Sequence, residues 1–227
     1  MNEKISLIIP SKNEIESLDS VLSELNDNKF VDEIIVVVDN EKDNSIIIAK
    51  KFNCKIIIQN NKGFGSAIIE GFKHASYKFG CIFNADYSFD PKYFEEIINK
   101  ASKYSFIFGT RYKGQSGSAD DDIVTFIGNR CFSFITKFIL GINLTDILYT
   151  YVLCDVEKFN SLSFQSFDFR LCIELPVLVN KNNFSYSEVS MFERKRYAGR
   201  KKVNVIKDGF LIFIEILKSF KYIFKKN

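Results

Sequence analysis

The stretch Cys81-Ile82-Phe83-Asn84-Ala85-Asp86-Tyr87-Ser88-Phe89-Asp90-Pro91 contains a predicted strand and a predicted metal site. Its apolar beginning is typical of a buried strand, and its closing proline opens an amphipathic helical stretch. Between the two, oxygen-bearing side chains stand at every second position, at Asn84, Asp86 and Ser88. Oxygen ligands at the carboxyl end of a buried strand suit Mg²⁺ or Mn²⁺. The simpler alternative is a polar strand end at which Asp86 caps the next helix.

The composition favours one globular domain with a sizeable core, or one such domain with an appendage. The chain has 227 residues, of which 46% are hydrophobic and 26% are charged. Five scattered cysteines without a Cys-x-x-Cys pair, and a single histidine, argue against a zinc site and favour reduced thiols in a cytosolic protein. We expect no signal peptide, and no transmembrane helix, because no apolar run reaches the roughly 18 residues that such a helix needs.

The net charge of +3 conceals an asymmetry along the chain. From Arg194 to Asn227 there are 11 basic and 2 acidic residues, so this end carries +9 and the remainder −6. A basic end on an acidic body predicts an anionic partner such as phosphate or an acidic membrane surface. Nucleic acid is also anionic, but nothing else in the sequence favours a nucleic-acid partner. We therefore expect none. A merely solvated tail is the alternative.

Apolar runs alternate with amphipathic stretches along the first half of the chain. Buried strands are predicted at residues 5–9, 33–38 and 54–58, in the opening stretch and at 106–108, with helices at 17–25, 45–52, 67–77 and 92–103. This alternation predicts an α/β fold with a doubly wound, mostly parallel sheet flanked by helices.

The loops after these strands carry the residues of a candidate nucleotide site, namely Asp39, Gly63, Gly65, Asp86 and Arg111. Because the carboxyl ends of parallel strands share one edge of a sheet, we expect all five at that edge. Each alone is more often an ordinary turn residue, so the prediction depends on their joint placement.

The second half contributes a loop, two helices and a basic run. The Gly/Ser/Asp-rich loop from Lys113 to Asp122 is a candidate lid. The helical run 123–140 carries Arg130, which needs an anionic partner or an exit to solvent. Six of the nine residues from Arg194 to Lys202 are basic. For the last apolar helix, 205–224, three roles are open: packing on the body, a dimer contact, or binding at a membrane interface. Its basic flanks favour the membrane interface.

Five motifs together resemble the family-two glycosyltransferases, and they are most similar to the polyprenyl-phosphate sugar transferases, such as dolichol-phosphate mannosyltransferase. They are Ile-Ile-Pro-Ser-Lys-Asn-Glu, Ile-Ile-Val-Val-Val-Asp-Asn, Lys-Gly-Phe-Gly-Ser-Ala, Asn-Ala-Asp-Tyr-Ser-Phe-Asp-Pro and Gly-Thr-Arg-Tyr. The resemblance implies a GT-A catalytic domain over residues 1–204 and an amphipathic basic helix over 205–227. It also implies metal-dependent, inverting transfer of a sugar from a UDP- or GDP-linked donor to a polyprenyl or dolichyl phosphate, at the cytoplasmic face of a membrane to which the protein binds peripherally.

The resemblance also implies roles for individual residues. Pro10, Ser11, Glu14 and Asp39 would hold the base and ribose, Lys62 and Gly65 would lie along the nucleotide, and Asn84, Asp86 and Ser88 would bind Mg²⁺ or Mn²⁺. Arg111, Arg130 and Arg196 would bind the acceptor phosphate or the leaving diphosphate, with Lys202 in support.

Four places depart from the family pattern, one of them being Lys201, where the family usually has serine. The family usually has Asp where Asn84 stands, Gln or a similar residue where Ser88 stands, and Asp-Asp-Gly-Ser where this chain has residues 39–42. Asn84 removes one negative charge from the predicted metal site, so we expect weaker metal binding there. These departures motivate a non-catalytic nucleotide-sugar-binding relative as one alternative.

The chemistry of the acceptor separates two further possibilities. A sugar hydroxyl, as in surface polysaccharide synthesis, must lose a proton during attack and needs a positioned base. A phosphate monoester has a second pKa near 6 and is already largely dianionic at pH 7, so it needs arginines rather than a base. Three arginines and a single histidine favour the phosphate, although Asp86, Asp146 and Glu174 stay open as bases.

Two other enzyme classes are disfavoured by the turn after the first predicted strand. Sugar-phosphate nucleotidyltransferases and dinucleotide oxidoreductases have a Gly-rich turn at that point, and this chain has none there.

Overall fold

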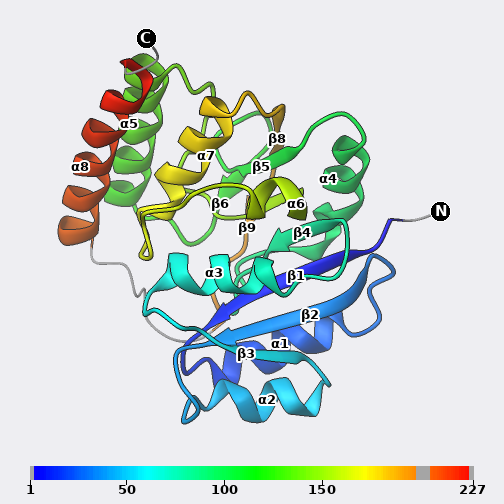
Figure 1. The fold of residues 1–227 in the computed structure, drawn as a ribbon. Coiled ribbons are helices and arrows are strands. Elements are labelled where there is room, and N and C mark those ends of the chain that lie inside the picture. The colour runs from blue at the N-terminus through cyan, green and yellow to red at the C-terminus, as the bar shows by residue number, and fades with distance from the viewer. Residues whose placement is uncertain (1–2, 198–204, 225–227) are drawn as a thin grey trace.

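A seven-stranded sheet forms the centre of the computed structural model, which describes residues 3–197 and 205–224 (Figure 1). Its strands are β1 (Ile5–Ser11), β2 (Val31–Val38), β3 (Lys55–Ile58), β4 (Phe79–Ile82), β5 (Phe106–Thr110), β7 (Val152–Asp155) and β8 (Tyr186–Ser190). They lie in the order β3-β2-β1-β4-β7-β5-β8, and every pairing except the two made by β7 is parallel. The predicted mostly parallel α/β fold is confirmed.

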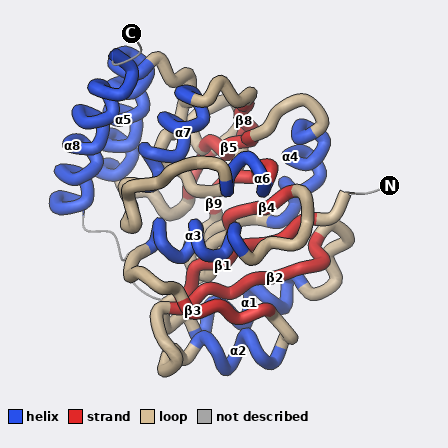
Figure 2. Tube along the Cα trace, viewed as in Figure 1, coloured by secondary structure: helices blue, strands red, loops and turns tan. Residues whose placement is uncertain are grey.

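Helices cover both faces of this sheet (Figures 1 and 2). One face packs against α1 (Ile15–Leu25), α2 (Ser45–Lys51) and α4 (Phe94–Ala101), the last entered through a 3-10 turn, η1 (Pro91–Tyr93). The other packs against α3 (Phe64–Lys73), α6 (Val156–Asn160) and α7 (Leu171–Lys181). Alternation along β1 produces the two layers, because Leu7 and Ile9 belong to the first core and Ile8 to the second.

Strand β7 is absent from the strands predicted from the sequence. It runs antiparallel between β4 and β5, so its amino end lies where the neighbouring strands have their carboxyl ends. Tyr149 and Thr150 precede it and are therefore brought to the edge at which ligands bind in such sheets. A pattern of local periodicity cannot reveal this reversal, because it is set by pairing between distant segments.

Helices α5 (Ile123–Leu140) and α8 (Val205–Phe224) pack against each other at one end of the molecule, where α8 also contacts α7 (Figure 2). Asp122 and Thr125 close the amino end of α5 in a reciprocal capping box, and Gly141 ends it in the left-handed conformation. Ile212 and Ile216 anchor α8 in the core.

The expectation that no helix is long and apolar enough to span a membrane was wrong for α5. Its 18 residues have a mean hydropathy of 1.4, and 17% of them are buried. The sequence analysis counted uninterrupted apolar runs, whereas the helix reaches this hydropathy while including Arg130 and Lys137. Length and composition alone do not decide whether such a helix crosses a bilayer.

The loop from Lys113 to Asp122 is tied to the chain that follows the main sheet. Within it, β6 (Gly117–Ser118) pairs in parallel with β9 (Phe192–Glu193), and the Ala119 amide donates to the Glu193 carbonyl at 2.9 Å. This pairing brings the acidic end of the loop beside the first residues of the basic run.

Candidate active site

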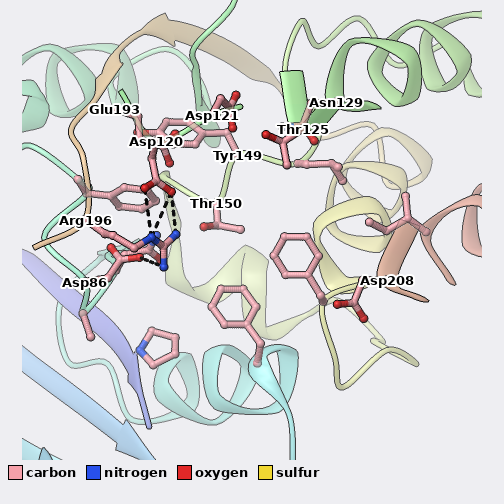
Figure 3. A pocket seen from close by; sticks show the side chains of 18 of the residues that line it. Asp86, Asp120, Asp121, Thr125, Asn129, Tyr149, Thr150, Glu193, Arg196 and Asp208 are labelled. Atoms are coloured by element: carbon pink, nitrogen blue, oxygen red, sulfur yellow. Dashed lines mark hydrogen bonds and ion pairs between the residues drawn. The ribbon is translucent and has the colours of Figure 1, made fainter. Parts of the chain in front are cut away.

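A cleft of about 500 Å³ opens at the carboxyl edge of the parallel strands (Figure 3). Strand ends and loops form its polar part, and helices α3, α5 and α8 form its apolar part. Of the residues that the sequence assigned to the site, those that line it are Pro10, Ser11, Glu14, Asp39, Gly63, Asn84, Asp86, Arg111 and Arg196. The fold therefore gathers into one cleft residues that lie up to 186 positions apart in the chain.

The loop after β1 is held in place by Asp43, a residue that the sequence analysis missed. The buried Asp43 carboxylate accepts from the Asn13 amide at 3.0 and 3.1 Å and from the Ser45 amide at 2.9 Å. Ser45 in turn accepts from the Glu14 amide at 3.0 Å and receives the Ser11 hydroxyl at 2.9 Å. Asn13 has a φ of 53°, so the turn adopts a left-handed conformation that these bonds stabilise.

Asp39 lies at the carboxyl end of β2 with its carboxylate facing the cleft. Lys12 Nζ lies 2.9 Å from one oxygen, and Gln59 Nε2 donates to the other at 2.7 Å. The hydrogen bond from Lys12 lowers the pKa of Asp39, so this group is ionised and accepts hydrogen bonds at neutral pH.

The glycine loop reaches the cleft at Gly63 and Phe64, and close packing accounts for both of its glycines. Gly63 has a φ of 128°, and a Cβ added there would lie 2.2 Å from the Phe167 carbonyl oxygen. A Cβ at Gly65 would lie 2.7 Å from the Asp168 carbonyl oxygen, and Gly65 is not among the cleft-lining residues. Both glycines therefore let the backbone after α6 approach α3 closely.

The loop after β4 presents the three predicted metal ligands. Ser88 donates to Asp86 Oδ1 through its hydroxyl at 2.6 Å and its amide at 3.0 Å, and Asn84 Nδ2 donates to the Ser88 hydroxyl at 3.3 Å. Asn84 and Asp86 line the cleft, whereas Ser88 is buried behind them. Asp90, and not Asp86, caps the following helical turn by accepting from the Lys92 amide. The capping alternative for Asp86 was therefore wrong.

These side chains fit a divalent cation that is bound together with a ligand. No set of three or more His, Cys, Asp or Glu side chains within residues 3–197 and 205–224 is grouped to hold a metal by itself. One carboxylate, with amide and hydroxyl oxygens beside it, nevertheless matches the oxygen ligands of Mg²⁺, which usually adds substrate phosphates to one or two protein carboxylates. Asp86 and the Asn84 carbonyl oxygen are the atoms placed for this role.

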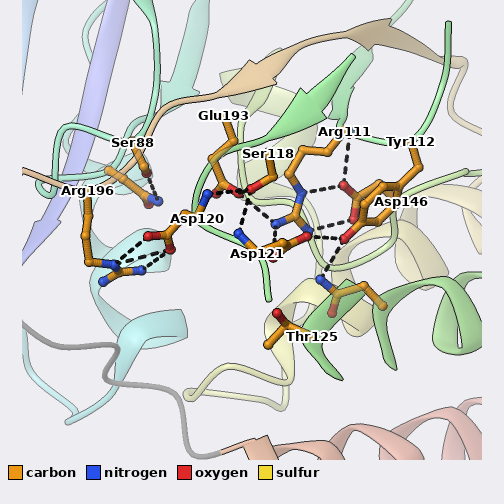
Figure 4. A network of polar contacts seen from close by, with 12 residues as sticks. Ser88, Arg111, Tyr112, Ser118, Asp120, Asp121, Thr125, Asp146, Glu193 and Arg196 are labelled. Atoms are coloured by element: carbon orange, nitrogen blue, oxygen red, sulfur yellow. Dashed lines mark hydrogen bonds and ion pairs between the residues drawn. The ribbon is translucent and has the colours of Figure 1, made fainter. Parts of the chain in front are cut away.

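Arg111 lies at the end of β5 in a buried network of carboxylates (Figure 4). Its guanidinium donates to both oxygens of Asp146 at 2.7 and 3.0 Å, to Glu193 at 3.0 Å and to Asp121 at 3.3 Å. Burial alone would lower the pKa of Arg111, but the carboxylates, Asp146 foremost, raise it above its ordinary value. Arg111 therefore holds three segments together, and its charge is already balanced within the protein.

Arg196 is a basic group that lies beside Asp86 in the cleft (Figure 3). It donates to the Asp120 carboxylate at 2.8 and 3.1 Å, and its Nη1 atom lies 3.6 Å from Asp86 Oδ2. The hydrogen bond to Asp120 raises the pKa of Arg196, which stays cationic. Asp120 belongs to the loop that the pairing of β6 with β9 holds in place. The Arg196 guanidinium is therefore paired with a carboxylate of the protein in this structure.

The remaining predicted cations do not join this group. Arg130 lines a second cavity, which is bounded by Tyr112 and by residues of the loop that ends at Asp122. Its guanidinium approaches the Tyr112 carbonyl at 3.5 Å. Lys62 is exposed and is not among the residues that line the cleft. Lys202 lies outside the described residues. Of the three predicted arginines, the structure thus leaves Arg196 as the one placed to meet a ligand phosphate.

Two of the three carboxylates considered as bases have structural roles instead. Asp146 is 1% exposed and is paired with Arg111. Glu174 is buried in α7, and its oxygens accept from the Gln165 and Ser166 amides at 2.7 Å. Glu174 thereby shapes the backbone that packs on Gly63 and Gly65. Neither carboxylate lines the cleft.

The lining of the cleft has an excess of negative charge. Among described residues, seven carboxylates and three basic side chains contribute to it. Asp120, Asp121 and Glu193 were not identified from the sequence, because they belong to the loop and strand that pair as β6 and β9. An anionic ligand would be repelled from this cleft unless a cation accompanied it.

The apolar part of the cleft lies between helices α5, α8 and α3. Val124, Phe132, Ile212 and Phe64 line it. Gly128 lies on the same face of α5, and a Cβ built there would meet nothing within 4 Å among the described residues. A glycine in a helix costs about 1 kcal/mol relative to alanine, so packing does not account for this one. The arrangement leaves open space beside the polar part of the cleft.

The sequence matches a known family over most of its length. The profile of Glycosyl transferase family 2 matches residues 6–163. UDP-N-acetylglucosamine–dolichyl-phosphate N-acetylglucosaminyltransferase of Methanococcus voltae is 29% identical over 94% of both chains. Dolichol-phosphate mannosyltransferase of Pyrococcus furiosus is 33% identical over 48% of this chain and 33% of its own.

The fold also matches solved structures. Glucosyl-3-phosphoglycerate synthase from Mycobacterium tuberculosis, solved with Mn²⁺, UDP and glucosyl-3-phosphoglycerate, superposes with a TM-score of 0.74 over 96% of this chain and 80% of its own. The two sequences are 16% identical, so this likeness concerns the fold alone.

Proposed function

The chain belongs to glycosyl transferase family 2, as its motifs predicted, and is a glycosyltransferase; from this we propose that it transfers a sugar from a UDP- or GDP-linked donor to a polyprenyl or dolichyl phosphate. The observation that carries the proposal is a single cleft in which Asp86 and Arg196 face each other and which continues between α5 and α8 as an apolar groove. A nucleoside diphosphate fits the polar part, and an isoprenoid chain fits the groove. The relatives named for dolichyl-phosphate transfer support this acceptor.

We assign the donor to the side of the cleft formed by Pro10, Ser11, Glu14 and Asp39. The ionised Asp39 accepts from hydroxyl groups such as those of a ribose. A divalent cation, Mg²⁺ or Mn²⁺, would be held by Asp86 and Asn84, with Ser88 orienting the Asp86 carboxylate. When bound, it supplies Lewis-acid stabilisation of the leaving diphosphate. The negative excess in the lining supports this need for a cation.

The residues present favour a phosphate as the nucleophile. A phosphate monoester is largely dianionic at pH 7 and attacks without a strong base. Asp146 and Glu174 are engaged in structural bonds, which removes two candidate bases for a sugar hydroxyl. The Arg196 guanidinium would release the Asp120 carboxylate and bind the acceptor phosphate instead. A single in-line displacement would invert the configuration of the anomeric carbon.

The direct test combines purified protein with UDP- and GDP-linked sugars, Mn²⁺ or Mg²⁺, and a polyprenyl phosphate. We expect a lipid-linked sugar that partitions into organic solvent and disappears when a chelator is added. Nucleotide-sugar binding without product would instead support a non-catalytic relative. Transfer to a saccharide but not to the lipid phosphate would support polysaccharide synthesis.

Arg196→Ala should raise the apparent KM for the polyprenyl phosphate by about ten- to a hundredfold, because a charge-assisted hydrogen bond is lost. The KM for the donor should change far less. Arg130→Ala is the matched control, and its position beside Tyr112 in the other cavity predicts less than about a threefold change. Initial rates at varied acceptor concentration measure both, and equal effects of the two substitutions would contradict the assignment.

We further propose that the protein lies on a membrane surface through α5 and α8. Large apolar side chains are exposed on both helices, among them Phe134, Phe138, Phe210, Phe213, Leu217 and Phe220. Those of α8 recur at intervals of three and four residues, so they share one face. An interface helix buries such a face at the level of the lipid headgroups, and the apolar groove would open toward the acyl chains.

Phe134→Ser combined with Phe138→Ser should weaken binding to anionic liposomes at least tenfold, because two exposed aromatic side chains no longer enter the bilayer. Ile47→Ser is the control, since Ile47 is 63% exposed on α2, at the opposite end of the molecule from α5 and α8 (Figure 1). Vesicle co-sedimentation measures both. Equal loss in the two variants would exclude the α5–α8 face as the contact.

A further inference from the structure

Tyr149 places a buried hydroxyl group in the wall of the cleft without a partner. The side chain is 5% exposed, and its oxygen makes no hydrogen bond to any part of the chain that the structure describes. Buried polar groups are nearly always satisfied, because leaving one unpaired costs free energy. The position therefore requires an explanation that packing does not give.

The Tyr149 ring is enclosed on three sides. The Arg111 guanidinium lies 4.7 Å from the ring centroid, and the Phe89 ring meets it edge-on at 5.1 Å. On a third side, a Cβ at Gly109 would lie 2.9 Å from the ring. A side chain enclosed in this way holds its buried hydroxyl in a fixed position in the wall of the cleft, as a preorganised binding group does.

The surroundings of this hydroxyl favour an uncharged polar ligand. Figure 3 shows Tyr149 in the same part of the cleft as Thr150, Asp120 and Glu193. Carboxylates repel phosphate oxygens but accept hydrogen bonds from hydroxyl groups. Burial raises the pKa of Tyr149 well above its ordinary value, so the phenol keeps its proton and does not act as a base. It can donate to a ligand oxygen and accept from a ligand hydroxyl.

We propose that Tyr149 hydrogen-bonds a hydroxyl group of the transferred sugar and thereby helps to select the donor. The inference rests on the proposed function in one respect, that the cleft holds a nucleotide-sugar. A site built to hydrogen-bond a substrate hydroxyl discriminates strongly against an analogue that lacks it, because the buried protein group is then left unpaired. Tyr149 would be a sugar-binding residue that takes no part in proton transfer.

Tyr149→Phe removes the oxygen and keeps the ring, so it isolates this bond. We expect the dissociation constant for the nucleotide-sugar to rise about tenfold, while that for the nucleoside diphosphate alone changes less than about twofold. Calorimetry with Mn²⁺ present measures both ligands. In a series of donors with one sugar hydroxyl at a time replaced by hydrogen, one member should bind wild type and Tyr149→Phe equally.

Tyr151→Phe is the matched control. Tyr151 is also buried, but its hydroxyl donates to the Asp90 carbonyl at 3.1 Å and it does not line the cleft. We expect Tyr151→Phe to lower the melting temperature by roughly 2–4 °C and leave ligand affinity unchanged. Tyr149→Phe should leave the melting temperature of the free protein unchanged or raise it, because an unpaired group is removed.

The outcomes separate this inference from the proposed function. Equal nucleotide-sugar affinity of wild type and Tyr149→Phe would overturn the role of Tyr149. Failure of the wild type to glycosylate polyprenyl phosphate would overturn the proposed acceptor, while the binding comparison would still decide the role of Tyr149. A wild-type protein that binds no nucleotide-sugar would overturn both.

Discussion

Asp86→Asn should reduce sugar transfer on the order of a hundredfold or more. Asp86 is the one carboxylate among the three predicted metal ligands, and Asn84 already provides an amide where the family usually has a second carboxylate. Lewis-acid stabilisation of a leaving group amounts to several kcal/mol, and each 1.4 kcal/mol is about a factor of ten in rate. Loss of the last charge at this position should therefore remove most of that stabilisation.

The loss should also be visible without turnover. In the wild type, Mn²⁺ should increase the affinity for the nucleoside diphosphate, because the cation offsets the negative excess in the cleft lining. In Asp86→Asn this dependence on Mn²⁺ should largely disappear. Titration calorimetry with and without the metal measures it.

Asp90→Asn is the control, since Asp90 lies on the same loop but does not line the cleft. Asparagine is as good a cap as aspartate, so the bond to the Lys92 amide should survive. We expect near-wild-type activity and an unchanged Mn²⁺ effect in Asp90→Asn. Undiminished Mn²⁺-dependent binding in Asp86→Asn would contradict the assignment of the metal.

The half of the site that lies on the parallel strands could be predicted from the sequence. Short apolar runs locate β1, β2 and β4, and the chain places polar residues directly after each. Since parallel strands end at one edge, Pro10, Asp39 and Asp86 had to meet there once the fold class was known. Local pattern and global topology agree in this part of the molecule.

The opposing wall of the cleft could not be predicted in the same way. It depends on β7 running antiparallel and on the pairing of two-residue strands, β6 and β9, which no periodicity reveals. Asp120 and Glu193 therefore went unnoticed. The family resemblance grouped Arg111 and Arg196 as phosphate ligands, whereas their partners in the fold differ: Arg111 is enclosed by carboxylates and Arg196 faces the cleft.

The enclosure of Arg111 leads to a second large effect, on stability. Arg111→Met should destabilise the protein by about 3–5 kcal/mol, because it leaves the buried Asp146 and Glu193 carboxylates without their counter-charge. For a chain of this size, that corresponds to a fall in melting temperature of roughly 10 °C or more. Thermal unfolding followed by circular dichroism measures it. Activity should fall as well, since Asp121 and Glu193 line the cleft.

The cause of this destabilisation can be tested with a double mutant. Asp146→Asn keeps an acceptor for the Arg111 amide but removes the charge, so adding it to Arg111→Met should restore about 1–3 kcal/mol. Arg130→Met is the matched control, since its guanidinium is exposed and bonds a backbone carbonyl, and it should cost less than about 0.5 kcal/mol. If Arg111→Met is as stable as Arg130→Met, the arginine is not needed to hold the cleft wall. Its guanidinium would then be available to a ligand phosphate, as the sequence motifs alone predicted.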